Sequence, residues 1–367
     1  MSPAPSLTFA DVAFTWPDGS RALDGITGSF SRGRTGLVGV NGAGKSTLLR
    51  LAAGELQPTS GRVTAAGDVG YLAQTLPLER TRTVAELLGV DDKLRALRAI
   101  EAGSVDERDY ELLGDDWDLE TRSDDALREI GLPAGALDRS VGTLSGGEGM
   151  LVAIAGLRLR RTPITLLDEP TNNLDRDARR RLAELVDRWG GALVVVSHDT
   201  GLLEHMDDTA ELYAGGLSVF GGPYSAWRMH LHEEQAAAAQ AVRAAEQQVR
   251  VERRQRVEAE TKIARRARAG EKLRENRSAP KIVLGAWERA AQVSAGKTRG
   301  MLDDRIRSAR AGLDAAEERL RDEEHILLDL PDPGVARGRR LAEFDGAERS
   351  FVLQGPERVA VIGANGA

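Results

Sequence analysis

The stretch GVNGAGKST, Gly39–Thr47, constrains the fold more than any other part of the chain. It fits the pattern G-x-x-x-x-G-K-[ST], and it lies between an apolar run, TGLVGV, and a segment with helical composition, LLRLAAGEL. A strand, a glycine-rich turn and a helix start in this order surround phosphate oxygens with backbone N–H groups. We therefore predict a phosphate-binding loop in which Lys45 reaches the phosphates and Ser46 binds Mg²⁺. The other loop residues expected at the nucleotide are Gly39, Asn41, Gly42, Gly44 and Thr47.

Residues 1–224 alternate short apolar runs with longer amphipathic segments. The runs Thr35–Val40, Ile164–Asp168 and Ala192–His198 suit strands buried on both faces of a largely parallel sheet. Arg176–Trp189 follows one of them and has the pattern of an amphipathic helix. We predict an α/β fold for this first domain.

Two acidic residues end the second of these runs. Asp168 is expected to hold Mg²⁺, and Glu169 is placed to orient and deprotonate an attacking water. The plainer alternative is an acidic turn at a strand end that has no part in catalysis.

The composition changes in residues 225–332. Glu233–Glu275 is rich in Ala, Glu, Gln and Arg and predicts one long helix, and Gly300–Leu330 carries the apolar stripe of a second. Two such helices joined by a short tip, Arg277–Gly300, are expected to fold back as an antiparallel hairpin.

Charge is unevenly distributed in this chain. Arg250–Arg310 contains 18 lysines and arginines against 8 acidic residues, whereas the whole chain has a net charge of −7. A basic segment in an acidic body indicates a local contact with a polyanion, and a solvated helix face is the alternative. The chain has no cysteine, which excludes disulfides, thiolate metal sites and a cysteine nucleophile. Its longest apolar runs are too short to span a membrane and it lacks a signal peptide, so we expect a cytoplasmic protein.

Residues 333–367 repeat the start of the first domain. Phe351 takes the place of Phe30, and Gly363–Ala367 match Gly39–Ala43 up to the point where the lysine is due. We interpret the chain as a piece of a longer protein that continues into a second copy. The alternative is a natural half-protein that needs a second domain in trans.

Further motifs resemble those of ATP-binding-cassette (ABC) ATPases. LSGGE (Leu144–Glu148) resembles the family signature and DEPTNNLD (Asp168–Asp175) its Walker B and D-loop. Gln74 resembles the Q-loop glutamine, His198 the switch histidine and Trp16 the aromatic residue that stacks on adenine. Taken singly, these have plainer interpretations as a surface glutamine, a hydrogen-bonded histidine and a core tryptophan.

The resemblance implies a site for ATP and Mg²⁺. Gln74 joins Ser46 and Asp168 at the metal, and Glu169, His198 and Gln74 are the catalytic residues. In this family two cassettes pack head to tail, so the signature contacts a nucleotide held by the other cassette. The signature residues concerned are Ser145, Gly146 and Gly147.

Two cassettes separated by a helical hairpin resemble the ABC-F subfamily. The resemblance implies binding at the ribosomal E site, with the tip Arg277–Gly300 directed to 23S rRNA and the P-site tRNA. It implies a role as a translation factor or as an antibiotic-resistance factor that protects the ribosome. Trp287 is expected to stack on a base or to close the tip. The basic residues expected at phosphates are Arg265, Arg266, Arg268, Lys272, Arg274, Arg277 and Lys281.

Two other classes of function stay open: the ATP-binding subunit of a transporter, and a regulatory protein that holds ATP without hydrolysing it. Some residues also depart from the family pattern. Gly149 and Met150 stand where a basic residue is usual, and Asn173 stands where ABC-F proteins usually have histidine. These departures put the efficiency of the signature in doubt, and they leave nucleotide binding at Lys45 unaffected.

Overall fold

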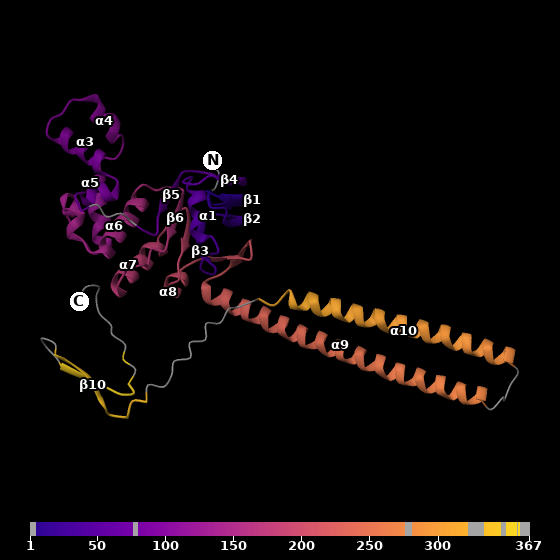
Figure 1. Ribbon diagram of the computed structural model, residues 1–367. Coiled ribbons are helices and arrows are strands. Elements are labelled where there is room, and N and C mark those ends of the chain that lie inside the picture. Colours follow the sequence, from indigo (N-terminus) through magenta and orange to yellow (C-terminus); the bar gives the residue numbers. More distant parts are fainter. Residues whose placement is uncertain are drawn as a thin grey trace. The chain divides into compact units, whose positions relative to one another are not determined.

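The computed structural model describes residues 5–75, 80–275, 281–321, 334–345, 350–357 and 359 (Figure 1). Side chains are described except at residues 270, 271, 273–275 and 281–288. The chain divides into two compact units, one of them Arg228–Gly334 and the other the rest. No helix in the described part of the chain is long and apolar enough to cross a membrane.

A mainly parallel sheet forms the centre of the first unit. Within the described residues it has six strands in the order β5-β6-β7-β3-β8-β9, and the pairing of β9 with β8 is antiparallel. Every residue of β6 and β7 is buried, which is why these strands are apolar throughout. The largely parallel sheet predicted from the apolar runs is confirmed. The strands are β3 (Gly33–Val38), β5 (Val69–Leu72), β6 (Ile164–Asp168), β7 (Ala192–Val196), β8 (Asp208–Tyr213) and β9 (Gly216–Gly221).

Helices follow the parallel strands. The loop after β3 enters α1 (Lys45–Ala52), and the loop after β6 enters α7 (Arg176–Asp187), close to the helix predicted there. Helix α8 (Thr200–Leu203) follows β7. The carboxyl ends of parallel neighbours lie at one edge of a sheet, so the loops after β3, β6 and β7 are brought together there.

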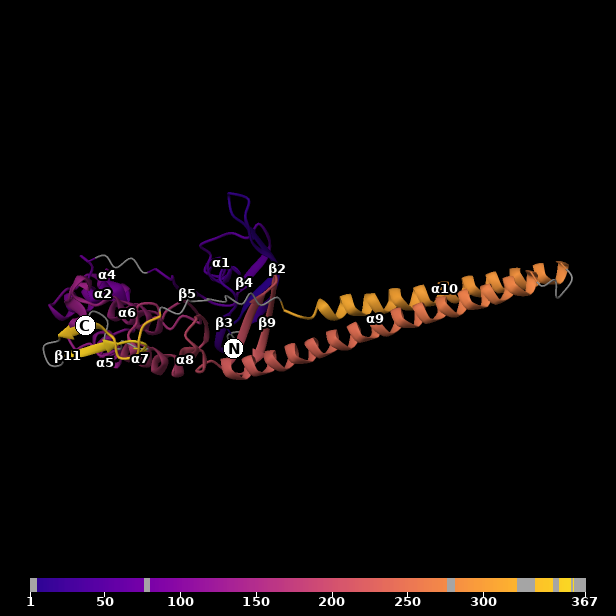
Figure 2. The same cartoon turned by 60° about the horizontal axis from the view of Figure 1, so that its bottom comes forward.

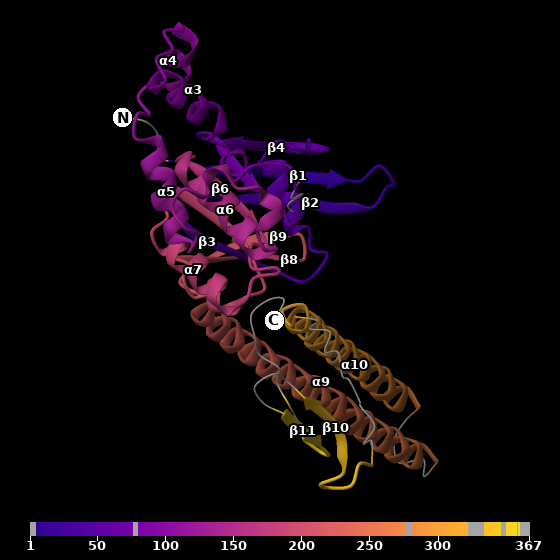
Figure 3. The ribbon, with the colours of Figure 1, turned by 90° about the vertical axis from the view of Figure 1, so that its left-hand side faces the viewer.

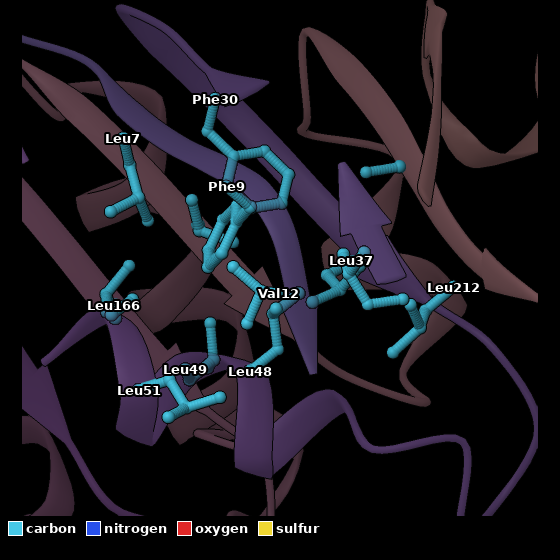
Figure 4. Packing of buried hydrophobic residues seen from close by; sticks show 14 of the residues in the cluster. Leu7, Phe9, Val12, Phe30, Leu37, Leu48, Leu49, Leu51, Leu166 and Leu212 are labelled. Carbon is cyan, nitrogen blue, oxygen red and sulfur yellow. The ribbon is translucent and has the colours of Figure 1, made fainter. Parts of the chain in front are cut away.

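A second, antiparallel sheet packs with the first around the core. Its order is β2-β1-β4, formed by β1 (Leu7–Thr15), β2 (Arg21–Phe30) and β4 (Ser60–Ala65). Figure 4 shows Phe9 and Phe30 of this sheet beside Leu37 and Leu48 of β3 and α1. The two phenylalanine rings meet edge to face at 5.9 Å. The core therefore fixes β1, whose end carries Trp16, against the helix that begins at the phosphate loop.

A helical region lies between β5 and β6. It was not foreseen as a separate region, because the sequence predicted only an alternation of strands and helices across this domain. Arg98 on α3 holds it together by ion pairs of 2.8 Å with both Glu120 and Asp138. Its helices are α2 (Val84–Leu88), α3 (Asp91–Glu101), α4 (Glu107–Leu113), α5 (Leu119–Glu129), η1 (Ala136–Asp138), η2 (Val141–Thr143) and α6 (Gly146–Leu159).

Two long helices make up most of the second unit. Helix α9 (Tyr224–Glu275) has 52 residues and α10 (Lys281–Glu317) has 37, and they run side by side as an antiparallel pair (Figures 2 and 3). Arg256 on α9 pairs with Asp303 on α10 at 3.3 Å. The side-chain amide of Gln235 accepts from the backbone N–H of Arg321, just beyond α10, at 2.9 Å. The predicted helical hairpin is therefore confirmed.

The predicted tip of this hairpin is wrong in its extent. Residues assigned to the tip up to Gly300 are helical from Lys281 onward. No proline occurs in Lys281–Glu317, and Gly285 and Gly296 do not end the helix, since helix packing and good helix formers outweigh single glycines. Arg277 lies outside the described residues.

A short hairpin represents the repeat near the end of the chain. Strands β10 (Arg340–Asp345) and β11 (Ser350–Gln354) pair antiparallel, and the rings of Phe344 and Phe351 stack at 4.7 Å. The partial second glycine-rich loop, Gly363–Ala367, lies outside the described residues.

Candidate functional site

The glycine-rich loop connects the end of β3 to the start of α1. Gly39 has φ +152°, and a Cβ there would lie 2.4 Å from the carbonyl oxygen of Leu212. Gly44 has φ +98°, and its Cβ would lie 2.7 Å from the carbonyl oxygen of Ala22. Any larger residue at either position would be strained and would clash with backbone, so the loop conformation requires both glycines.

Lys45 is the first residue of α1, and only 7% of it is exposed. Its ammonium donates to the carbonyl oxygens of Gly39 at 2.7 Å and Val40 at 3.1 Å. Burial lowers the pKa of Lys45, and the carboxylates of Glu169 and Asp168 oppose that shift. A buried cation held by two neutral carbonyls can exchange them for phosphate oxygens, which bind it more strongly.

Asp168 ends β6 and is 1% exposed. Burial raises its pKa, and hydrogen bonds from Ser46 and Tyr71 act against that shift. Its Oδ1 is buried and has no hydrogen-bond partner among the described residues. A buried carboxylate oxygen without a donor, beside a serine hydroxyl, suits a hard cation with oxygen ligands, and the residues present therefore fit Mg²⁺.

Glu169 follows directly and has φ +50°, a strained conformation for this residue type. Its N–H donates to the carbonyl oxygen of Val196 at 2.8 Å, which ties it to β7. Its carboxylate lies 3.1 Å from Nε2 of His198. Burial raises the pKa of Glu169, and His198 partly offsets the shift. A carboxylate with a raised pKa, oriented by a histidine, has the properties of a general base.

Lys45, Glu169 and His198 line a cavity of about 690 Å³. That volume lies in the usual range for small-molecule and cofactor sites. Asp168 and Gly39 lie just outside its lining, and the signature residues are not part of it. Of the residues predicted from sequence, those that line the cavity are Trp16, Asn41, Gly42, Gly44, Lys45, Ser46, Thr47, Gln74, Glu169 and His198. The lining also includes residues that the sequence did not indicate: Ser20, Arg21, Ala22, Asn172 and Val196.

The signature forms the start of α6, away from the cavity. Ser145 caps the helix: its Oγ accepts from the N–H of Glu148, whose carboxylate accepts from the N–H of Ser145 at 2.8 Å. Ser145 and Gly146 are exposed, and Gly147 is buried beside Leu174. The cap uses Ser145 Oγ as an acceptor only, so its hydroxyl proton and the first helical N–H groups can still be donated to an anion.

The departures from the family pattern have physical explanations here. Gly149 and Met150 are both buried within α6, and the capping box stabilises a helix start that Gly149 alone would weaken. Asn173 has φ +64°, a left-handed conformation that asparagine and histidine adopt more readily than most residues. Asparagine therefore suits the local backbone at the position where histidine is usual.

A chain of contacts runs from His198 to the start of α9. Asp199 caps α8 and pairs with Arg179 at 3.3 Å. Glu204 follows α8, and its two carboxylate oxygens accept from the N–H and the hydroxyl of Ser225, both at 2.8 Å. The segment that carries the candidate histidine thus also holds the first turn of the long helix.

Two contacts at the site were not predicted from the sequence. Tyr71 donates to Asp168, and burial raises the pKa of its hydroxyl to about 12. Arg50 places its guanidinium 5.9 Å from the centre of the Trp16 ring. The alternation in GYL predicts a strand but not which side chain of it faces Asp168, and nothing in the sequence relates residues 16 and 50.

Comparison with known proteins agrees with this geometry. A family model described as ABC transporter matches residues 23–172. The energy-coupling factor transporter ATP-binding protein EcfA of Methanosphaera stadtmanae is 31% identical over 217 residues, which cover 58% of this chain and 77% of that protein. The chain belongs to the ABC ATP-binding cassette family. Its cassette is thus of a kind that binds ATP, and ATPase activity is a general property of such cassettes.

Longer relatives match the same cassette. The tylosin resistance ATP-binding protein TlrC of Streptomyces fradiae is 36% identical over 254 residues, 62% of this chain and 46% of that protein. The energy-dependent translational throttle protein EttA of Mycobacterium tuberculosis is 35% identical over 227 residues, 56% of this chain and 40% of that protein. The chain thus spans less than half the length of these two relatives.

Proposed function

We propose that this chain belongs to an ATP-hydrolysing protein of the ABC-F type that acts on the ribosome, as a translation factor or in antibiotic resistance. The observation that carries the proposal is the antiparallel pair α9–α10, which follows the cassette directly and presents exposed cations. TlrC and EttA, two of the curated relatives, are named for tylosin resistance and for a translational throttle. Those names support this class of function.

The cassette residues have distinct roles in this proposal. Lys45 binds the terminal phosphates, and Trp16 receives the adenine ring. Ser46, Gln74 and Asp168 hold Mg²⁺, which when bound neutralises charge on the phosphates. Glu169 takes a proton from the attacking water while His198, at 3.1 Å, keeps its carboxylate aimed into the cavity.

The signature of this cassette serves a nucleotide held by another cassette. Ser145 and Gly146 are exposed and remote from the cavity, which is the placement that a composite site needs. We accordingly propose three domains: a first cassette at 1–224, a helical linker at 225–332 and the start of a second cassette at 333–367. The second cassette is supplied by the same protein or in trans.

The electrostatics of α9 support a nucleic-acid partner. Near its middle, Arg254 pairs with Glu258 at 3.8 Å and Arg256 pairs with Glu260 at 3.6 Å. Farther along the helix, Arg265, Arg266 and Arg268 are exposed and form no ion pair with another described residue. Cations without protein partners can neutralise phosphates and release counterions, and the partner proposed for this end of the hairpin is 23S rRNA and P-site tRNA.

A ribosome sedimentation experiment tests the proposal. Glu169→Gln, in protein expressed from the complete gene, is expected to accumulate with ribosomes in the presence of ATP, because hydrolysis no longer releases it. The matched control is Lys45→Met combined with Glu169→Gln. This double variant is still unable to hydrolyse ATP, but it lacks the lysine that binds the phosphates, so it should sediment less with ribosomes. If Glu169→Gln and the double variant sediment equally and no more than wild type, the ribosomal function is wrong.

The transporter subunit is the second candidate, favoured by the match to EcfA over 77% of that protein. It requires ATPase activity that depends on a membrane protein partner. A purified protein whose hydrolysis is stimulated by a membrane fraction, and not by ribosomes, would establish this alternative. A protein that only holds ATP is recognised by hydrolysis at background level that Glu169→Gln leaves unchanged.

A further inference from the structure

Trp16 is the first residue after β1, and its backbone is fixed by the turn that follows. Its N–H donates to the carbonyl oxygen of Ser20 at 2.8 Å, and its own carbonyl oxygen accepts from the N–H of Gly19 at 2.9 Å. Ser20 in turn donates through both its N–H and its hydroxyl to Asp18. These hydrogen bonds fix the backbone beneath the indole.

Two side chains hold the indole itself. The Phe14 ring, which is buried, meets it edge to face with centroids 4.9 Å apart and planes at 89°. The guanidinium of Arg50 lies over the ring, 5.9 Å from its centroid. Trp16 lines the cavity, whereas Arg50 is not part of its lining. The guanidinium therefore holds the indole from a position outside the lining of the cavity.

Arg50 is itself anchored. Its Nε pairs with Oε2 of Glu55 at 3.2 Å, and its carbonyl oxygen accepts from the N–H groups of Glu55 and Leu56 at 3.0 and 3.3 Å. It occupies the last turn of α1, the helix that begins with Lys45. This helix of eight residues thus carries Lys45, the residue expected to bind phosphate, at its start and Arg50, which contacts the indole, near its end.

We propose that Arg50 is a positioning residue for the nucleotide base: its guanidinium over the Trp16 ring restricts that ring to the orientation in which it stacks on the purine. A cation over one face of an indole restricts the ring and is itself attracted to the π-system. Because Lys45 and Arg50 share α1, the distance between the phosphate end and the base end of the site is set by one rigid element. This inference rests on the proposed function, since it takes ATP as the ligand.

Calorimetric titration of the purified chain tests the proposal, with Mg·ATP and inorganic tripolyphosphate as separate ligands. Tripolyphosphate has the phosphates but no base. Arg50→Met keeps the length of the side chain and removes its charge, and we expect ATP affinity to fall about 2- to 5-fold. Tripolyphosphate affinity should not change. In the background of Trp16→Ala, Arg50→Met should have no further effect on ATP affinity.

Two control variants refine the result. Arg50→Lys retains a cation and should recover part of the ATP affinity that Arg50→Met loses. Glu55→Gln keeps the guanidinium but loosens its anchor, and its effect should be smaller than that of Arg50→Met.

The remaining outcomes overturn the inference in distinguishable ways. If Arg50→Met weakens ATP and tripolyphosphate equally, Arg50 only stabilises α1. If Trp16→Ala weakens ATP and Arg50→Met does not, Arg50 has no role at the base although the ATP site stands. If neither Trp16→Ala nor Lys45→Met weakens ATP binding, the ATP site in the proposed function is itself wrong.

Discussion

At the candidate site of the cassette, Lys45, Asp168 and Glu169 are between 1% and 7% exposed, whereas Arg265 and Arg266 on α9 are exposed to solvent. The buried groups have shifted pKa values, and each is held by hydrogen bonds or by a neighbour of opposite charge. The exposed arginines are solvated and need no partner to be stable. Buried charge is costly until a ligand compensates it, so the cavity is specific, whereas exposed charge acts at longer range and depends on salt.

The largest effect expected from this comparison is on ATP binding. Lys45→Met removes charge-assisted hydrogen bonds worth about 1.5–3 kcal/mol, which corresponds to an affinity loss of roughly 10- to 100-fold. Titration of Mg·ATP at two salt concentrations would measure it. Because the site is buried, the ratio of wild-type to variant affinity should depend only weakly on salt. A loss that vanished at high salt would place Lys45 with the exposed charges instead.

The next effect concerns RNA binding by α9. A triple variant, Arg265→Gln, Arg266→Gln and Arg268→Gln, should weaken binding of a short RNA duplex by about 10-fold or more and reduce the slope of log affinity against log salt by roughly 2–3. Its thermal stability should be unchanged, since these side chains are exposed and make no ion pair with a described residue. Fluorescence anisotropy across a salt series measures both quantities.

Glu258→Gln is the matched control for that variant. It releases Arg254 from its pair and so adds a cation instead of removing one. RNA affinity should rise slightly and the salt slope should steepen by less than about 1. If the triple variant and Glu258→Gln both left the slope unchanged, α9 would not contact phosphates.

The smallest effect is on the stability of the ligand-free cassette. The folded-state pKa of Asp168 is raised above 3.8, so its carboxylate favours folding when protonated, and this contribution is lost as pH rises through the raised pKa. Asp168→Asn should therefore raise Tm by about 2–4 °C at pH 7 to 8. The gain should shrink as pH falls toward 3.8. Thermal melts from pH 4 to 8 measure it, and a gain that grew on acidification would contradict the sign of the shift.

Sequence patterns predicted the parts of the fold that depend on local chemistry. The loop glycines, the buried strand ending in Asp168 and the long α9 follow from motif, hydropathy and composition. Helix α9 ends at Glu275 as predicted, but it begins at Tyr224 and not at Glu233. The start of α10 was missed, because Arg277–Gly300 was assigned to the tip and the second helix was expected from Gly300, whereas α10 begins at Lys281. Contacts such as Tyr71–Asp168 and Arg50–Trp16 were missed because they join residues whose proximity arises only from the packing of the two sheets.

The two hydrogen bonds that Glu204 accepts from Ser225 lie at one end of a very long helix. At 1.5 Å per residue, the 52 residues of α9 form a rod about 78 Å long. A tilt of about 5° at its first turn would move the far end by roughly 7 Å, about the spacing of two nucleotides along a strand. The length of α9 therefore makes the position of its far end sensitive to the geometry of the two hydrogen bonds at Ser225.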